Sequence, residues 1–196
     1  NRVDSVKLDR TAFSAASLLE PSDEKAYWLS RSPYERLQAV ELMRQIVYGY
    51  DPSTTDFKEF LRLLNVHHVE YLLIGGYAVG YHGYPRATAD MDIWIALERV
   101  NADRVVAALK EFGFDSPEPS PELFLRPWQI IRLGMPPLRI EIATTISGVD
   151  FADCYAARVE DVLDGVPVHL ISLTHLKINK KASGRHQDLA DLDELP

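Results

Sequence analysis

The hydrophobic positions of residues 56–196 alternate between the spacing of strands and the spacing of helices. Short apolar or alternating runs predict strands at 69–76 (VEYLLIGG), 90–97 (DMDIWIAL), 124–134, 136–146 and 166–172. Helical spacing predicts helices at 56–65, from Gly75 to about 83, at 101–114 and, as one or two helices, at 173–195. A capping box at Asp56 opens the first helix, and Asn101 and Gly113 are the expected cap and stop of the third. This order of strands and helices predicts a compact α/β domain.

Residues 1–52 show one long helix and little other periodicity. Ser32 is the expected N-cap, Pro33 the first helical residue and Glu35 the partner that closes a capping box, and Gly49 ends the helix. Pro52, Ser53 and Thr54 then predict a loop. The apolar stripe of this helix consists of Leu37, Val40, Met43, Ile46 and Val47.

A single amphipathic helix is marginal in water, so residues 1–52 must be ordered by docking. We expect Trp28 and the apolar stripe to be buried against the domain at 56–196 or against another chain. The short connection after Gly49 favours exchange between two copies, which predicts a homodimer in which this segment supplies much of the contact and shades the functional site.

Two aspartates occupy one face of the strand at 90–97. Side chains alternate along a strand, so Asp90, Asp92 and Trp94 point away from Met91, Ile93 and Ile95. Two carboxylates held this closely repel, and a divalent metal removes the conflict. The alternation at 139–142 places Glu141 away from the apolar face, so a neighbouring strand brings a third carboxylate to the pair. We expect the three to converge on one point and to hold two Mg²⁺ ions in a phosphoryl-transfer site. A solvated strand face is the competing interpretation for an isolated Asp-x-Asp.

The glycine pair Gly75-Gly76 follows a strand and opens a helix. Its backbone N–H groups and the positive end of the helix dipole can face a phosphate without obstruction by side chains. A dinucleotide-binding fold is excluded because Gly75, Gly76, Gly80 and Gly83 do not have the Gly-x-Gly-x-x-Gly spacing.

The charge distribution limits the possible partners. A net charge of −8 argues against a general nucleic-acid coat, although Leu173 to Gln187 contains Lys177, Lys180, Lys181 and Arg185 without an acid. Lys177 and Lys181 lie one helical turn apart with Lys180 beside them, and these side chains can be aimed at a triphosphate or can form a solvated helix face. Arg185 with Asp188 fits an ion pair equally well. No apolar run reaches the length of a membrane span, so we expect a cytoplasmic protein that does not bind a membrane.

At Gly75-Gly76, Asp90-Met91-Asp92 and Glu141, the sequence resembles the nucleotidyltransferase superfamily, the group that includes polymerase β. The stretch GGYAVGYHGYPRATADMD, in which Arg86-x-Thr88 precedes the aspartates, looks closest to the branch of the AbiEii-type abortive-infection toxins and the small antibiotic nucleotidyltransferases. The resemblance covers residues 56–196. Residues 1–52 are similar to small bacterial proteins encoded beside such enzymes, which act as partners in pairs of the toxin–antitoxin type.

The resemblance implies a mixed sheet flanked by helices (α+β) with an N-terminal helical extension. It implies a Mg²⁺-dependent enzyme that transfers a nucleoside monophosphate from an NTP to an acceptor hydroxyl, with Asp90, Asp92 and Glu141 as metal-binding catalytic residues. The nucleotide would be bound by Gly75, Gly76, Arg86, Thr88, Lys177, Lys181 and Arg185. A tRNA end, a protein hydroxyl and a small antibiotic are the alternative acceptors, and a degenerate transferase fold that only binds a partner is the alternative to an enzyme.

Overall fold

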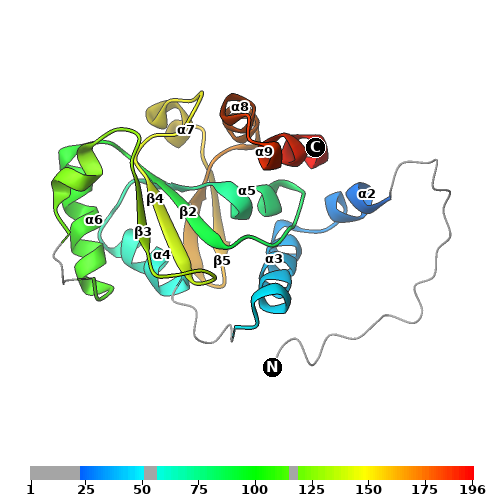
Figure 1. The fold of residues 1–196 in the computed structure, drawn as a ribbon, viewed down its shortest axis with the longest axis horizontal. Helices are drawn as coiled ribbons and strands as arrows, with labels where there is room; N and C mark the ends of the chain where they lie inside the picture. Colours follow the sequence, from blue (N-terminus) through cyan, green and yellow to red (C-terminus); the bar gives the residue numbers. More distant parts are fainter. Residues whose placement is uncertain (1–22, 51–56, 115–118) are drawn as a thin grey trace.

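The computed structural model describes residues 23–50, 57–114 and 119–196, and Figure 1 shows how they are arranged. Within these ranges, six strands form one mixed sheet in the order β3-β4-β2-β1-β6-β5, and helices cover both of its faces. β1–β6 and β2–β4 are parallel pairs, and the other neighbours are antiparallel. The predicted fold class, a mixed α/β sheet flanked by helices, is confirmed.

The elements alternate along the chain as the hydrophobic pattern predicts. The strands are β1 (Tyr71–Leu73), β2 (Asp90–Ile95), β3 (Ile130–Leu133), β4 (Arg139–Ala143), β5 (Val159–Leu163) and β6 (Val166–Leu170). The helices are α2 (Glu24–Leu29), α3 (Pro33–Tyr48), α4 (Phe57–Val66), α5 (Gly75–His82), α6 (Arg99–Glu111), the short 3₁₀ helix η2 (Pro121–Leu125), α7 (Phe151–Ala156), α8 (Leu173–Ser183) and α9 (His186–Glu194). Strand β5 was not predicted from the sequence. The expected capping box at Asp56, the loop at 52–54 and residues 1–22 lie outside the described residues.

The alternation of β2 separates the core from the acid-bearing face. Met91 and Ile93 belong to the larger apolar cluster, which packs under α4 and α6. Trp94 belongs to a second cluster on the opposite face and packs edge to face against Phe151 of α7. Trp94 is 2% exposed, so the face that carries Asp92 becomes apolar and closed toward this end of the strand.

Helix α3 begins and ends where the sequence predicts. The Ser32 hydroxyl accepts from the Glu35 N–H, the Glu35 carboxylate accepts from the Ser32 N–H, and Gly49 ends the helix with a φ of +69°. Leu37 and Val40 are buried as expected.

The predicted burial of Trp28 and of the other apolar residues of the α3 stripe is wrong. Ile46 is 59% and Val47 is 61% exposed, and Met43 and Trp28 are only half-buried. Helix α3 is rotated about its axis from the expected orientation, because the face that docks on the domain also carries Arg36 and Arg44. These two side chains are 7% and 0% exposed. Hydrogen bonds to backbone carbonyls of the domain, rather than apolar area alone, set the orientation of α3.

Two buried arginines of α3 bind carbonyl groups on segments far away in the sequence. Arg44 donates to the carbonyl of Thr88, just before β2, at 2.6 Å and to the carbonyl of Pro137, just before β4, at 2.5 Å. Arg36 donates from Nε to the carbonyls of Gly80 and Tyr81 at 3.2 and 3.1 Å. Helix α3 therefore holds both strands that carry the acidic residues, together with the end of α5.

The expected cap of α6 is also wrong. Helix α6 begins at Arg99 with Glu98 as its N-cap, so Asn101 lies inside the first turn. The Asn101 amide instead donates to the carbonyls of Glu70 and Ala96 and accepts from the Glu70 N–H, fastening α6 to the flanks of β1 and β2. Gly113, with a φ of +100°, follows the helix end as predicted.

Helices capable of crossing a bilayer are absent from the described part of the chain, since none combines sufficient length with sufficient apolarity.

Candidate active site

The acidic residues are brought together by the parallel pairing of β2 and β4. Asp92 lies opposite Glu141, and Asp90 lies opposite Arg139. Paired residues project from the same face of a sheet, so all four side chains share the face away from the larger core. The predicted third carboxylate therefore comes from the neighbouring strand.

A guanidinium bridges two of the three carboxylates. Arg139 Nη2 lies 2.6 Å from Asp90 Oδ2 and 3.0 Å from Glu141 Oε1. Arg132 Nε of β3 lies 2.9 Å from the same Glu141 oxygen. Asp90 and Glu141 thus converge on one cationic atom, and the cation at that position is an arginine of the chain itself.

The Asp92 carboxylate packs against Gly75 at the start of α5. Burial raises the pKa of Asp92 to about 6, and the charges of Asp90 and Glu141 add to this shift, while Lys180 and a hydrogen bond from the backbone N–H of Gly76 oppose it. The Asp92 carboxylate is therefore short of positive charge when it is ionised.

The donor set matches Mg²⁺ in its chemistry, although the described residues contain no group of three His, Cys, Asp or Glu side chains arranged to hold a metal ion. The Arg139 guanidinium lies between Asp90 and Glu141, and Asp92 remains short of positive charge. The two-metal arrangement of the three carboxylates stays a prediction, which the chemistry of these donors fits.

The glycine pair is required by close packing beneath the acids. A Cβ on Gly75, which has a φ of +60°, would lie 1.9 Å from Asp92 Oδ2. A Cβ on Gly76 would lie 2.6 Å from Thr88 Oγ1. The Gly76 N–H that we expected to face a phosphate is bonded to Asp92. The pair therefore seats Asp92 and Thr88 against the start of α5.

We expect Gly75→Ala to destabilise the protein and to displace Asp92, because no L-residue has space beside this carboxylate. Gly165→Ala is the matched control, since Gly165 also has a positive φ (+81°) but no heavy atom within 4 Å of an added Cβ. The control should lose about 1 to 2 kcal/mol of unfolding free energy and Gly75→Ala clearly more, measured by urea denaturation. Equal losses in both variants would contradict the tight seating of Asp92.

A cleft of about 270 Å³ opens over Gly75, Asp92 and Glu141 and brings acids and cations together, whereas Asp90 is not among its lining residues. Asp92, Glu141 and Gly75 line it from the sheet side, and Lys180 and Arg185 line it from α8 and its C-terminal end. Ser172 caps α8 by accepting from the His175 N–H, and Gly184 ends it. These ends fix the turn at which Lys180 faces the cleft.

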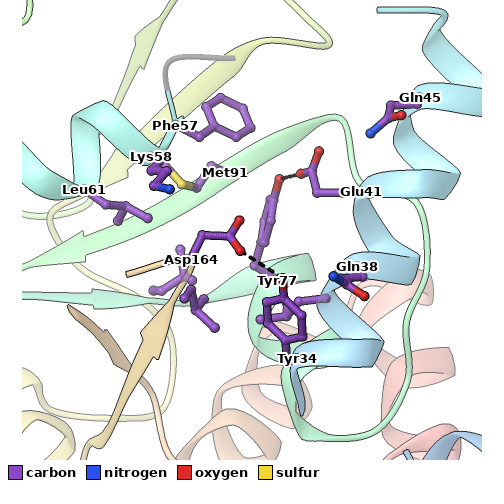
Figure 2. Close-up of a pocket in the computed structure, with 13 residues that line it drawn as sticks. Tyr34, Gln38, Glu41, Gln45, Phe57, Lys58, Leu61, Tyr77, Met91 and Asp164 are labelled. Carbon is purple, nitrogen blue, oxygen red and sulfur yellow. Dashed lines mark hydrogen bonds between the residues drawn. The ribbon is translucent and has the colours of Figure 1, made fainter. Parts of the chain in front are cut away.

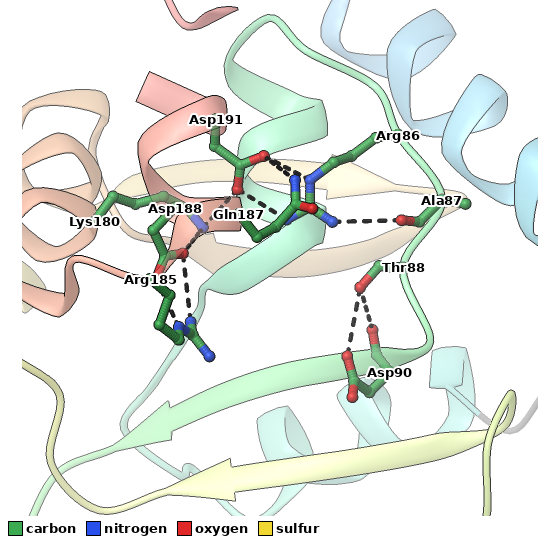
Figure 3. Close-up of polar contacts among 9 residues, drawn as sticks. All are labelled: Arg86, Ala87, Thr88, Asp90, Lys180, Arg185, Gln187, Asp188 and Asp191. Atoms are coloured by element: carbon green, nitrogen blue, oxygen red, sulfur yellow. Dashed lines mark hydrogen bonds and ion pairs between the residues drawn. The ribbon is translucent and has the colours of Figure 1, made fainter. Parts of the chain in front are cut away.

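Lys180 belongs to a buried ion network that ties α8 and α9 to the loop before β2 (Figure 3). Its amino group lies 2.6 Å from Asp188 and 2.7 Å from Asp191. Arg86 binds both oxygens of Asp191 at 2.6 and 2.8 Å, and Arg185 Nε binds Asp188 at 2.6 Å. Burial alone would raise the pKa of Asp188, but hydrogen bonds from Arg185 and Lys180 outweigh it and lower the pKa to about 2. Three cations face two acids here, so the network keeps positive charge beside Asp92.

The structure brings some of the predicted nucleotide-binding residues to the cleft and places others elsewhere. Gly75 and Arg185 line it. Arg86 is paired with Asp191, and Thr88 is buried, with its hydroxyl 3.4 Å from Asp90 Oδ1. Lys177 donates to the carbonyl of Pro196, and Lys181 is exposed outside the cleft lining.

Three residues of the cleft region were not among the predicted site residues, and one of them, Arg139, had a signal in the sequence. Lys180 pairs with Asp188 and Asp191 of α9, and this pairing depends on how α9 packs against α8. Arg139 alternates with Glu141 along β4 and therefore shares its face. Trp128 precedes β3, and nothing in its local sequence distinguishes it from a core tryptophan.

A larger cavity, of about 380 Å³, lies on the other face of the sheet between α3 and α4 (Figure 2). Its carboxylates are already satisfied: Glu41 accepts from Tyr77 and Tyr50, and Asp164 accepts from Tyr34. Met91, on the reverse side of β2 from the aspartates, forms part of its wall. Both carboxylates of this cavity are bound by tyrosine hydroxyls, whereas Asp92 in the cleft is short of positive charge, so the cleft is the candidate active site.

No protein-family profile and no curated protein sequence matches the chain. Among solved structures, the fold is similar to an antigenic nucleotidyltransferase-like protein from Paracoccidioides brasiliensis. The two chains share 17% sequence identity with a TM-score of 0.43, and the match covers 70% of this chain and 72% of the other.

Proposed function

We propose that the chain is a nucleotidyltransferase, which moves a nucleoside monophosphate from an NTP to an acceptor hydroxyl. The observation that supports this proposal best is the cleft in which Asp92 and Glu141 lie opposite Lys180 and Arg185. Carboxylates that bind metal and cations that bind phosphate are the two groups that phosphoryl transfer requires in one place.

The three acids would bind the metal. Asp90, Asp92 and Glu141 would hold Mg²⁺, which would neutralise charge on the triphosphate and lower the pKa of the acceptor hydroxyl. The Arg139 guanidinium would release Asp90 and Glu141 and remain beside them, where it can bind a phosphate oxygen.

The cationic wall would bind the departing phosphates. The acceptor hydroxyl would lose its proton to solvent as its oxygen attacks the α-phosphorus, the bond from that phosphorus to the bridging oxygen would break, and pyrophosphate would leave with the electron pair. Lys180 is fixed by two acids and Arg185 is 76% exposed at the rim, so the first supplies a rigid positive charge and the second a mobile one. Arg86 would act indirectly, by orienting Asp191 toward Lys180.

Three acceptor classes fit the proposal: a tRNA end, a hydroxyl of a protein and a small hydroxylated antibiotic. A role in a bacterial toxin–antitoxin or phage-defence pair, with the protein in the cytoplasm as a homodimer, is part of the same proposal. The exposed apolar side chains of Ile46 and Val47 on α3 offer a surface for the second copy.

The proposal is tested by incubating the protein with Mg²⁺, each α-labelled NTP and each acceptor class. We expect label on one acceptor together with release of pyrophosphate. Asp90→Asn should lose metal-dependent NTP binding in calorimetry and lose transfer, whereas Asp103→Asn, a half-exposed aspartate of α6 paired with Arg99, should behave like the parent.

A degenerate, non-catalytic binding module is the second candidate, and one observation favours it. Arg139 and Arg132 already neutralise Glu141 without a metal. If the parent protein binds no NTP in a Mg²⁺-dependent way, the enzyme proposal fails and the binding module is preferred.

A further inference from the structure

An exposed tryptophan stands at the cleft with an unusual backbone. Trp128 is 66% exposed and has a φ of +60°. Positive φ is rare for a large side chain and costs on the order of 1 to 3 kcal/mol. Within the described residues, no aromatic ring or cation stacks on this indole. Neither packing nor local conformational preference accounts for its position.

The indole lines the same cleft as the cations. Trp128 and Ile130, at the start of the edge strand β3, line the cleft together with Asp92, while Lys180 and Arg185 line it from α8. Ile130 is 51% exposed and pairs with Ala143 of β4. Lys180 and Arg185 therefore offer positive charge for phosphates, and Trp128 with Ile130 offers an apolar, aromatic patch beside the acids that fits a flat ring.

We infer that Trp128, supported by Ile130, is a stacking platform for the nucleobase of the NTP. The inference rests on the proposed function, since Lys180 and Arg185 position the triphosphate and leave the base to the aromatic patch. Every base has a π face, so stacking on an indole tolerates all four bases and contributes affinity without hydrogen-bond recognition. The site thus selects an aromatic ring rather than a particular base.

The experiment compares two ligands on matched variants by calorimetry with Mg²⁺. Each of the four NTPs is compared with inorganic triphosphate, which has the charge but no ring. We expect Trp128→Leu to weaken NTP binding about 5- to 100-fold and to leave triphosphate binding within about twofold. Trp128→Phe, which keeps a ring, should retain most of the NTP affinity.

Two further measurements separate binding from folding. NTP should quench the fluorescence of the parent and of Trp28→Phe, but not that of Trp128→Phe, while inorganic triphosphate should quench none of them. Trp128→Gly should unfold at the same temperature as the parent or higher, because glycine relieves the positive φ and an exposed side chain loses little packing.

The outcomes are distinct. If neither ligand binds the parent, the proposed function fails. If both bind and Trp128→Leu changes neither affinity, or weakens both equally, the stacking platform is overturned and the transferase proposal stands. A marked loss of thermal stability in Trp128→Gly would show that the indole is structural, which also overturns the inference.

Discussion

Replacing Asp92 by Asn is expected to remove nucleotidyl transfer and to make the metal-free protein more stable at neutral pH. The variant loses a negative charge from the proposed metal site, so transfer should fall about 100- to 1,000-fold or more. It keeps an oxygen that can accept from the Gly76 N–H, which limits the structural damage. Radiolabel transfer and chemical denaturation in EDTA measure the two effects.

The stability gain should depend on pH with a definite sign. The Asp92 pKa is raised in the folded protein to about 6, so between about pH 4 and pH 6 the unfolded chain releases this proton while the folded chain retains it. Stability therefore falls as pH rises through that window. The amide of the Asp92→Asn variant does not titrate, so we expect this variant to gain about 2 to 3 kcal/mol over the parent above pH 6 and nothing below pH 4.

Mg²⁺ and a surface control make this result specific. Millimolar Mg²⁺ should stabilise the parent and not Asp92→Asn, and Asp103→Asn should match the parent under all conditions. A variant that is destabilised at pH 7 in EDTA would show that the carboxylate has a structural role and would contradict its assignment to a metal site.

Replacing Arg44 by Leu should produce the largest loss of stability among the substitutions considered. The guanidinium is fully buried, binds the carbonyls of Thr88 and Pro137 and lies 3.4 Å from Glu41. Its removal leaves the carbonyls of Thr88 and Pro137 without these donors and Glu41 without its ion-pair partner, which costs about 3 to 5 kcal/mol. The unfolding temperature should fall by on the order of 10 °C.

Arg62→Leu is the matched control for Arg44→Leu. Arg62 of α4 also pairs with a glutamate three residues away, Glu59, but its side chain is 48% exposed. Its loss should change the unfolding free energy by less than about 0.5 kcal/mol. If Arg44→Leu costs no more than this control, the docking of α3 does not depend on its buried arginine.

The acid-bearing face could be predicted from the sequence because strand alternation is a local property. The prediction that Asp90, Asp92 and Glu141 share a face required only a period of two and one pairing between neighbouring strands. The helix caps at Ser32 and Gly49 were equally accessible, since each is decided within one turn of the chain.

The orientation of α3 could not be predicted because it depends on partners far away in the sequence. The stripe containing Ile46 and Val47 is the more apolar face, yet the acceptors for Arg44 lie at positions 88 and 137. Asn101 shows the same limit: a residue that commonly caps a helix binds the carbonyls of Glu70 and Ala96 instead. In the cleft, the packing of α9 gives Lys180 an environment different from that of Lys177 and Lys181. No local sequence pattern shows how α9 packs.

The strand order also affects how the chain can fold during its synthesis. Central strand β1 pairs with β2 on one side and with β6 on the other, where Leu73 lies opposite Leu170. Until residues near 170 have left the ribosome, the second edge of this buried apolar strand has no partner. Such an edge is a template for pairing with other chains, and contacts of this sequence separation form slowly. Late arrival of the β5–β6 hairpin therefore makes the partly synthesised chain vulnerable to aggregation, and chaperone binding to the open edge of β1 would protect it.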